Sequence, residues 1–299
     1  MSDDQVDCIV RFHDMRGLYQ LNRCVFSVVG QRHRPLTVIL AVQRFSGTEI
    51  STVREALEPL LSLPGAPTLT IVNWEDPAPL DARSSLVNLG LAAATGRYVA
   101  FLDYDDVLYP EAYAALVERI RVTGAAITFA TVRCVRANVY PQFIHVISQI
   151  DSKFRGENLR DLFQSNFCPI HSYLIDRHYV AKDLMVFDDT LTWEEDYDFL
   201  LKICATYPAD FSLRKMAIGD YYYKNDDSNT VATDGILSGS RLTDYERVSE
   251  LLEARRRTTR VAPVVQKALG FAEPQPEMTI RGALNALTRL DADRREVAE

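Results

Sequence analysis

The sequence predicts an α/β protein in which a mostly parallel sheet is flanked by helices and followed by a helical extension. Short apolar runs alternate with segments of helical periodicity over the first 110 residues, which is typical of a parallel sheet with right-handed crossovers. A cluster of acids follows the fourth apolar run, and from Arg241 onward the chain is charged and helical in pattern. We expect residues 1–235 to form an α/β domain, with halves at 1–110 and 111–235, and residues 236–299 to form the extension.

The first half alternates strand and helix without a break. Its predicted strands are short and rich in branched or aromatic side chains, whereas its predicted helices carry apolar residues every three or four positions. We expect strands at residues 6–12, 36–42, 69–72 and 98–102, and helices at residues 18–29, 53–63 and 82–96.

The second half is less regular, and residues 140–162 have no clean period. Thr192, with Glu195 three residues later, has the form of a capping box and predicts a helix with Thr192 as its N-cap. We further expect a helix at 110–122, strands at 125–135, 167–176 and 216–223, and helices of the extension at 242–257, 264–269 and 279–290.

Composition excludes several classes of protein. The net charge of −8 disfavours a nucleic-acid partner. Five widely spaced cysteines argue against a zinc site or a disulfide framework and favour a reducing compartment. The start of the chain has no signal-peptide pattern, and no apolar run approaches the roughly 20 residues that cross a bilayer. We therefore expect a soluble cytoplasmic protein that is at most peripheral to a membrane.

The acid cluster consists of Asp103, Asp105 and Asp106, directly after the predicted strand at 98–102. In open α/β sheets ligands bind at the carboxyl ends of the strands. Crowded carboxylates repel one another unless a cation compensates, and hard oxygen ligands suit Mg²⁺ or Mn²⁺. The alternative is that these acids only begin the helix near Pro110.

A second acidic group, Glu194, Glu195 and Asp196, lies about ninety residues further on, beside Trp193. As structure alone, acids at the start of a helix are favourably placed in the field of its peptide dipoles. The two acidic groups and the segment before the first one are more specific together than apart.

That combination resembles the family 2 glycosyltransferases, in which an Asn-x-Gly segment leads through a strand to Asp-x-Asp-Asp and a Glu-Asp pair follows. The opening Ile9–Asp14 and Ser27–Gln31 are similar to the family's first strand and the segment after it, so the resemblance covers roughly the first 230 residues. The matching positions of the central segment are Asn88, Gly90, Ala94, Gly96, Tyr98, Phe101, Leu102, Asp103, Asp105, Asp106 and Pro110.

The resemblance implies a GT-A fold and a metal-dependent, inverting glycosyltransferase of hexosyltransferase type that uses a nucleotide sugar, with a UDP-sugar as first choice. It implies a nucleotide-binding half at 1–110 and an acceptor-binding half at 111–235. Mn²⁺ or Mg²⁺ would lie on Asp105 with Asp103 and Asp106, and Asp103 would also face the ribose. Asp196 would be the general base and Glu195 would orient the acceptor or the base. The remaining implied contacts are those of Arg83, Arg11 and Asp14 with the donor, and of Trp193 and His171 with the acceptor.

Some positions keep two interpretations. His171 is either an acceptor contact or a satisfied core residue. Where many family members have an Asp-Asp-Gly-Ser segment, this chain has Ala41-Val-Gln-Arg-Phe-Ser-Gly47, so the nucleotide base is not specified. Two pairs of interpretations concern loops. Glu75 and Asp76 either face the nucleotide or are plain loop acids, and the polar run of Lys224, Asn225, Asp226 and Asp227 either reaches the metal or diphosphate or is a loop without a ligand.

Two other functions stay open. A sugar nucleotidyltransferase would ordinarily carry a glycine-rich basic loop after the first strand, of which Arg11–Gly17 is a poor version. A non-catalytic nucleotide-sugar or glycan-binding module of the same fold is favoured by the missing acid after the second strand and opposed by the two intact acidic groups. For an enzyme, the expected acceptor is a glycan, lipid-linked or protein hydroxyl in polysaccharide, cell-wall or glycoconjugate synthesis.

The arginine cluster of the extension, Arg255–Arg257 with Arg260, either touches an anionic membrane surface or is the solvated face of a helix.

Overall fold

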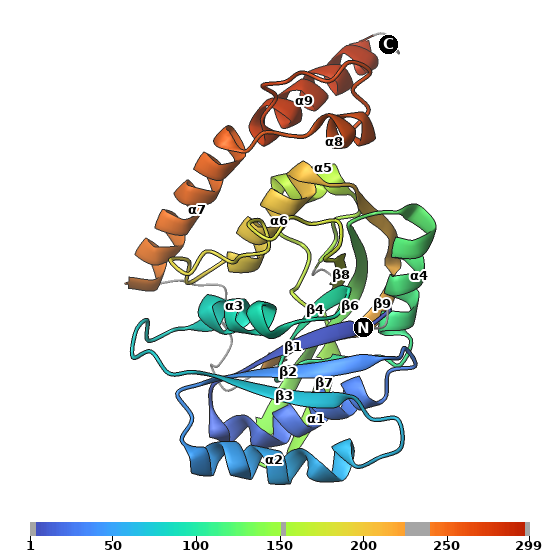
Figure 1. Cartoon of the computed structure of the whole chain (residues 1–299). Helices are drawn as coiled ribbons and strands as arrows, with labels where there is room; N and C mark the ends of the chain where they lie inside the picture. Colours follow the sequence, from blue (N-terminus) through green and yellow to red (C-terminus); the bar gives the residue numbers. More distant parts are fainter. Residues whose placement is uncertain (1–3, 151–153, 225–239, 297–299) are drawn as a thin grey trace.

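The computed structural model describes residues 4–150, 154–224 and 240–296. A nine-stranded sheet forms the centre, with helices on both faces and three helices standing beyond one end (Figure 1). The strands are β1 (Val6–Phe12), β2 (Leu36–Gln43), β3 (Thr68–Trp74), β4 (Tyr98–Asp103), β5 (Val107–Leu108), β6 (Ile127–Tyr140), β7 (Phe143–Gln149), β8 (Tyr173–Asp176) and β9 (Ala209–Lys224). The helices are the 3-10 helix η1 (Met15–Gly17), α1 (Leu18–Val29), α2 (Gly47–Leu61), α3 (Arg83–Ala93), α4 (Ala112–Thr123), α5 (Leu159–Gln164), α6 (Glu195–Thr206), α7 (Ser240–Thr258), α8 (Pro263–Ala268) and α9 (Ile280–Glu296).

The sheet is parallel where the sequence predicted it to be. Its order is β3-β2-β1-β4-β8-β6-β9-β5, with β7 paired to β6. The strands β3, β2, β1 and β4 are mutually parallel, whereas β8 pairs antiparallel with both β4 and β6. The fold class is therefore confirmed, and the carboxyl ends of β1 and β4 lie side by side in the middle of the sheet.

Two apolar cores cover the two faces of the sheet. Helices α1, α2 and α4 pack on one face, where the buried residues of α1 recur every three or four positions as predicted, at Leu21, Cys24, Val25 and Val28. Helices α3 and α6 pack on the other face. All five cysteines are buried and free.

The family-like segment before the acids is explained by close packing. A Cβ on Gly96 would lie 2.8 Å from the Gln5 carbonyl oxygen, and one on Gly90 would lie 2.4 Å from the Ile9 side chain. The Asn88 side chain donates to and accepts from the backbone of Phe187, at 2.9 and 2.8 Å. The two glycines therefore allow close backbone packing around β1, and Asn88 links α3 by hydrogen bonds to the segment that leads into α6.

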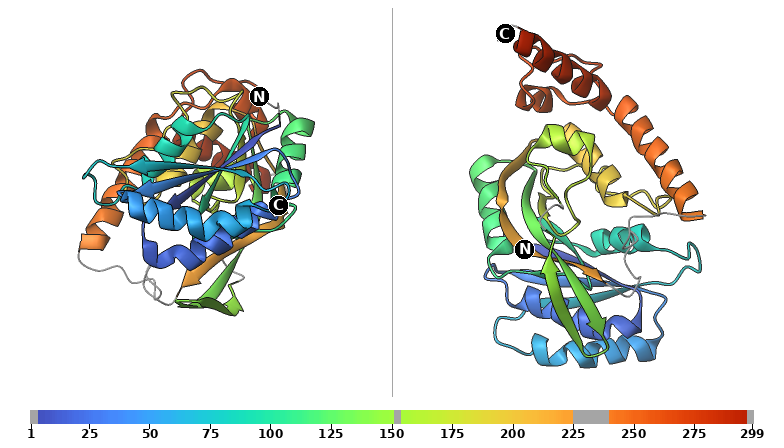
Figure 2. Two further views of the ribbon diagram at one scale, coloured as in Figure 1. Left: turned by 60° about the horizontal axis from the view of Figure 1, so that its bottom comes forward. Right: turned by 180° about the vertical axis from the view of Figure 1, so that it is seen from behind.

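Several predicted boundaries were wrong. Helix α2 begins at Gly47 rather than at 53, because Ser46 and Glu49 form a capping box that the apolar spacing did not reveal. The predicted strand at 167–176 shortens to β8, and the stretch without a clean period, 140–162, contains β7 and α5. Figure 2 shows β6 and β7 projecting together from the body of the molecule.

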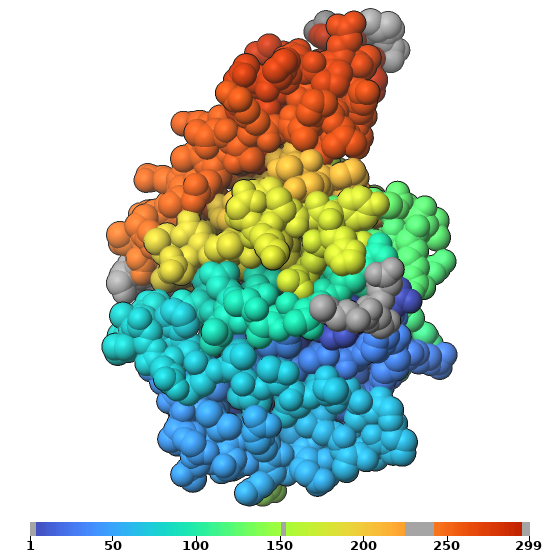
Figure 3. Space-filling view, viewed as in Figure 1, coloured from blue at the N-terminus to red at the C-terminus, as the bar shows by residue number. Residues whose placement is uncertain are grey.

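The carboxyl-terminal helices pack on α5 and α6 and stand out from the body in the space-filling view (Figure 3). Val248, Leu252 and Ile280 belong to the same buried cluster as the apolar side of α6. Two members of the arginine cluster contact the body of the molecule: Arg255 pairs with Asp188 and Asp198, and Arg256 donates to the carbonyls of Phe163 and Gln164. The other two pair within the extension, Arg257 with Glu253 and Arg260 with Glu277. Arg255 and Arg256 therefore dock α7, a role that neither sequence interpretation included. Within the described residues no helix combines the length and apolarity needed to cross a membrane.

Candidate active site

Asp103 of the first acidic group and all three acids of the second line one cavity of about 230 Å³, which lies at the carboxyl ends of β1 and β4. The strand ends contribute one wall and the start of α6 contributes the opposite wall. Its polar lining residues are Arg11, Arg83, Asp103, Asn166, Glu194, Glu195 and Asp196, and the other residues in its wall are Phe154, Pro169, Ile170, Trp193, Tyr221 and Tyr223.

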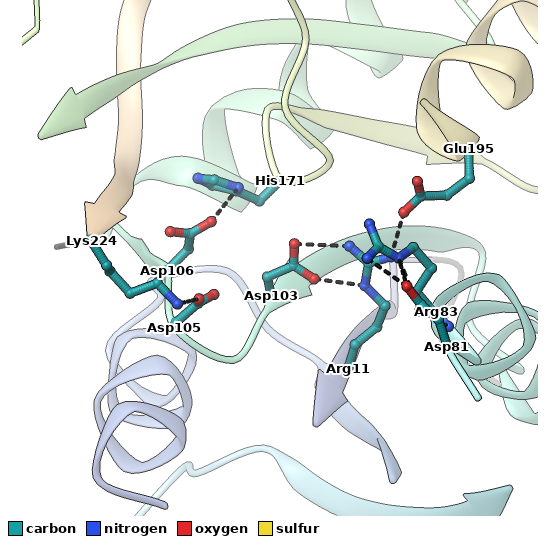
Figure 4. A network of polar contacts seen from close by, with 9 residues as sticks. All are labelled: Arg11, Asp81, Arg83, Asp103, Asp105, Asp106, His171, Glu195 and Lys224. Atoms are coloured by element: carbon teal, nitrogen blue, oxygen red, sulfur yellow. Dashed lines mark hydrogen bonds and ion pairs between the residues drawn. The ribbon is translucent and has the colours of Figure 1, made fainter. Parts of the chain in front are cut away.

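Arg11 joins the two walls (Figure 4). Its Nε and Nη2 donate to the two oxygens of Asp103 at 2.6 and 2.9 Å, and its Nη1 donates to Glu195 Oε1 at 2.8 Å. Burial disfavours the charged form of Asp103, but the charge and hydrogen bonds of Arg11 outweigh it and lower the pKa of that carboxyl. Arg11 thus lies in the predicted cavity with its guanidinium held by two carboxylates, and its expected diphosphate contact stays a prediction.

Helix α6 begins one residue after Glu194, which has a left-handed backbone with φ 55°. The predicted capping box is wrong, since Glu194 is the N-cap and the Glu195 side chain turns to Arg11. A non-glycine residue in this region costs conformational energy and is often found at functional sites. Asn166 Nδ2 secures the turn by donating to Glu194 Oε2 at 3.0 Å and to Asp196 Oδ1 at 3.3 Å.

Asp196, like Glu194, makes no ion pair within the described residues, whereas Glu195 pairs with Arg11. Its Oδ1 accepts the N–H of Tyr197 at 2.8 Å, at the amino end of α6. Burial first, and then the charges of Glu195 and Glu194, raise the pKa of Asp196 well above its usual range. A carboxylate with a raised pKa on a cavity wall has the property that a general base needs.

The three acids of the first group turn to different partners. Asp105 Oδ2 lies 2.6 Å from Lys224 Nζ, and Asp106 Oδ1 accepts the N–H of Tyr222 at 2.8 Å. With Asp103 on Arg11 and Asp105 on Lys224, two of the three carboxylates are already paired with cations of the protein. In the described part of the chain no group of three His, Cys, Asp or Glu side chains is arranged to hold a metal ion. The predicted ligands for Mn²⁺ or Mg²⁺ therefore turn to separate partners and do not converge on one point in this structure.

Asp106 and His171 lie together behind the cavity. Asp106 is 3% exposed, and burial with the charges of Asp105 and Asp103 raises its pKa well above the usual range. His171 Nδ1 lies 3.4 Å from Asp106 Oδ2, and its side chain is fully buried. Burial lowers the pKa of His171 to about 4, so the ring is neutral at pH 7. The expected acceptor contact of His171 is therefore corrected to the core role.

The remaining predicted residues divide in two. Arg83 and Trp193 do line the cavity, with Arg83 Nη2 paired to Asp81 at 2.7 Å. Asp14 does not, because its carboxylate caps η1 and pairs with exposed Arg16, which corrects its expected donor contact. Glu75 and Asp76 are exposed loop acids away from the cavity wall. Asn225, Asp226 and Asp227 lie outside the described residues.

Sequence reasoning missed Asn166 and gave Glu194 no role of its own. Asn166 stands just before the predicted strand at 167–176 and carries no signal of its own, since its partners lie 28 and 30 residues away. Lys224 was named only as one of several loop candidates, and its contact with Asp105 spans 119 residues. Such contacts follow from sheet topology, here the pairing of β9 with β5 and β6.

Residues 82–184 match the sequence model of the family described as Glycosyl transferase family 2. Among solved structures, TarS 1–349 from S. aureus superposes with a TM-score of 0.58 and 13% identity over 84% of this chain. A TarS 1–349 complex with UDP-GlcNAc gives 0.57 at 14% identity over the same share. The mannosyltransferase PcManGT from Pyrobaculum calidifontis, in complex with GDP-Man and Mn²⁺, gives 0.52 at 14% identity over 98% of this chain.

These likenesses differ in how much of the other protein they include. The chain spans 64% of TarS 1–349, 66% of the chain in its UDP-GlcNAc complex, 42% of the longer TarS chain and 81% of PcManGT. A search of curated proteins gives no match. At such low identities the similarity to solved structures shows the fold alone. The family match concerns the segment that contains the acid cluster. Residues 82–184 of this chain are thus similar to glycosyl transferase family 2, and the fold of the whole is that of the GT-A glycosyltransferases.

Proposed function

We propose that the chain is an inverting glycosyltransferase that moves a sugar from a nucleotide-diphosphate sugar, a UDP-sugar in the first instance, to an acceptor hydroxyl. The observation that carries this proposal is that Arg83 on the strand-end wall and Asp196 on the opposite wall line the same cavity. Sugar transfer needs positive charge for the leaving diphosphate and a base for the acceptor oxygen. The cavity offers both.

The reaction follows from these positions. The acceptor oxygen bonds to the anomeric carbon while the bond from that carbon to the diphosphate oxygen breaks, and the electron pair leaves with the nucleoside diphosphate. Asp196 takes the acceptor proton, because its pKa is raised and its carboxylate is not neutralised by an ion pair among the described residues. A positioned base contributes about 10²–10⁴ in rate. Attack from the side opposite the leaving group inverts the anomeric centre.

On the donor side we assign the diphosphate to Arg83, whose side chain is 28% exposed on the cavity wall. Asp103 is assigned to the ribose, since Arg11 fixes its carboxylate at the end of β4. Trp193 is half-buried beside the acids of α6 and is assigned to the acceptor sugar ring. Apolar ring faces that pack on polar ligands are a common means of orientation in such cavities.

The divalent ion remains a prediction of the resemblance, with Asp105 as its first ligand. An ion at this carboxylate would have to displace Lys224, so no step of the reaction is assigned to it. The expected acceptors are glycans, lipid-linked sugars or proteins, in polysaccharide, cell-wall or glycoconjugate synthesis. A reducing, cytoplasmic setting at most peripheral to a membrane is proposed from the five free cysteines and the composition.

Calorimetric titration with UDP, GDP, CDP and dTDP tests the proposal, each with Mn²⁺ and again with a chelator. Binding of one diphosphate, weakened in Arg83→Met, is expected and would name the donor class. Absence of binding to all four by the folded protein would reject the assignment. Binding without turnover of the corresponding sugar nucleotide would favour the non-catalytic module instead. Pyrophosphate release from a nucleoside triphosphate and a sugar phosphate would identify a nucleotidyltransferase.

A further inference from the structure

Arg11 connects three parts of the chain that are far apart in sequence. It stands at the end of β1, and its partners Asp103 and Glu195 follow 92 and 184 residues later. Nε, Nη1 and Nη2 each donate to a carboxylate oxygen, at 2.6, 2.8 and 2.9 Å. The Arg11 side chain is 14% exposed and that of Glu195 is 7% exposed. Such a forked, partly buried contact fixes the direction of both carboxylates.

The direction of Glu195 matters because Asp196 is the next residue on the same helix. Adjacent residues on a helix point to different sides, so they do not share a partner. With Glu195 turned to Arg11, Asp196 turns to Asn166 and the Tyr197 N–H. If Glu195 were released, a second carboxylate would be free to approach Asp196 in the same cavity.

We propose that Arg11 is a positioning residue: by holding Glu195 against the strand end, it keeps that carboxylate away from Asp196, so that Asp196 rather than Glu195 accepts the acceptor proton. The inference rests on the proposed function where it calls Asp196 the base. It goes beyond the sequence interpretation, in which Arg11 met the donor diphosphate.

The charges around Asp196 determine in which direction its pKa should change when Arg11 is replaced. Glu194 and Glu195 raise the pKa of Asp196, and Arg11 lowers it. From other elements, Cys168 and, in β8, Tyr173 interact electrostatically with Asp196, Arg83 and Asp103 line the same cavity from the strand-end wall, and Arg256 of α7 acts on Glu194. Replacing Arg11 removes the favourable charge and releases Glu195, and both changes push the titration of Asp196 to higher pH.

The test is a carbon-13 NMR titration of the full chain with labelled aspartate carboxyl groups, in which Asp196→Asn identifies the Asp196 signal. We expect Arg11→Met to move this titration to higher pH and Glu195→Gln to move it to lower pH. Arg16→Met is the matched control, since Arg16 is 91% exposed on the same segment and pairs with Asp14. An Asp196 titration that is the same in Arg11→Met as in Arg16→Met would overturn the proposal.

A double-variant cycle separates positioning from direct attraction. If Arg11 acts through Glu195, the shift caused by Arg11→Met is smaller in a Glu195→Gln background. An undiminished shift would show that Arg11 acts on Asp196 by itself and would contradict the positioning role. Arg11→Lys replaces Arg11→Met in the cycle if the latter does not fold, because it keeps the charge and loses the fork.

The titration uses no donor and no acceptor. Its failure is therefore distinguishable from failure of the proposed function, which would appear as absent nucleoside diphosphate binding by the wild-type chain. Where turnover is found, the pH profile of UDP release from UDP-GlcNAc gives a second readout, with its rising limb at higher pH in Arg11→Met than in wild type.

Discussion

Docking of the carboxyl-terminal extension depends on Arg255, whose replacement by Ala should measurably destabilise the protein. Its Nε lies 3.1 Å from Asp198 Oδ1, and its Nη2 lies 2.8 Å from Asp188 Oδ2. Asp198 is fully buried in α6, where Lys202 is its other cationic partner at 3.0 Å. Losing Arg255 would leave a buried carboxylate with one of its two cations.

The magnitude follows from these contacts. Removing one partner of a buried ion pair costs about 3–5 kcal/mol. The Arg255 side chain is 40% exposed and Lys202 remains, so solvent and the second cation reduce the expected loss to about 1–2 kcal/mol. For a chain of this size that corresponds to a fall in melting temperature of roughly 2–6 °C.

Differential scanning calorimetry of Arg255→Ala measures this loss against a close control. Arg257 is two residues away, 69% exposed and paired with Glu253, so Arg257→Ala should change the free energy of unfolding by no more than about 0.5 kcal/mol. Equal melting temperatures for the two variants would refute the idea that Arg255 fastens α7 to α6.

Three further predictions concern the cavity. Arg83→Met should weaken binding of the matching nucleoside diphosphate by about ten- to a hundredfold, as for a lost charged hydrogen bond, and calorimetry that finds equal affinities would remove Arg83 from the donor site. Asp196→Asn should raise the melting temperature at pH 7 and above. The pKa of Asp196 is raised in the folded state, so its contribution to stability is present at low pH and is lost as the pH rises through that pKa. A variant whose stability gain over wild type is the same at pH 4 and pH 8 would contradict this sign. Lys224→Met should strengthen Mn²⁺ binding, followed by water-proton relaxation, since an ammonium 2.6 Å from Asp105 competes with a cation there; an unchanged or weaker affinity would show that the two do not compete.

The first half of the fold could be predicted because its signals are local. Strand β1 and helix α1 have the predicted bounds, Val6–Phe12 and Leu18–Val29. Short buried strands and amphipathic helices can be predicted from the spacing of apolar residues. Gly90 and Gly96 could be matched to a family segment, although only the structure shows that a Cβ at either position would collide with β1 or the residue before it.

The details of the site could not be predicted in the same way, because they depend on contacts between distant residues. The two partners of Arg11 lie on β4 and α6, and nothing near Arg11 in the sequence distinguishes a diphosphate ligand from a carboxylate partner. His171 is buried because β9 and Asp106 cover it. The start of α6 was misplaced for a local reason, since the left-handed backbone of Glu194 replaces the expected cap at Thr192.

The central claim is that Asp196 serves as the base for transfer of a sugar from a nucleotide-diphosphate donor. Proton NMR of donor turnover by wild type and Asp196→Asn tests it most directly, with UDP-, GDP-, CDP- and dTDP-sugars supplied in turn and a range of sugar acceptors present. We predict that one donor is consumed by wild type, that the first product has the inverted anomeric configuration, and that Asp196→Asn binds the same donor but consumes it about 10²–10⁴ times more slowly. Consumption at the wild-type rate by Asp196→Asn, or a product that retains the configuration of the donor, would contradict the account.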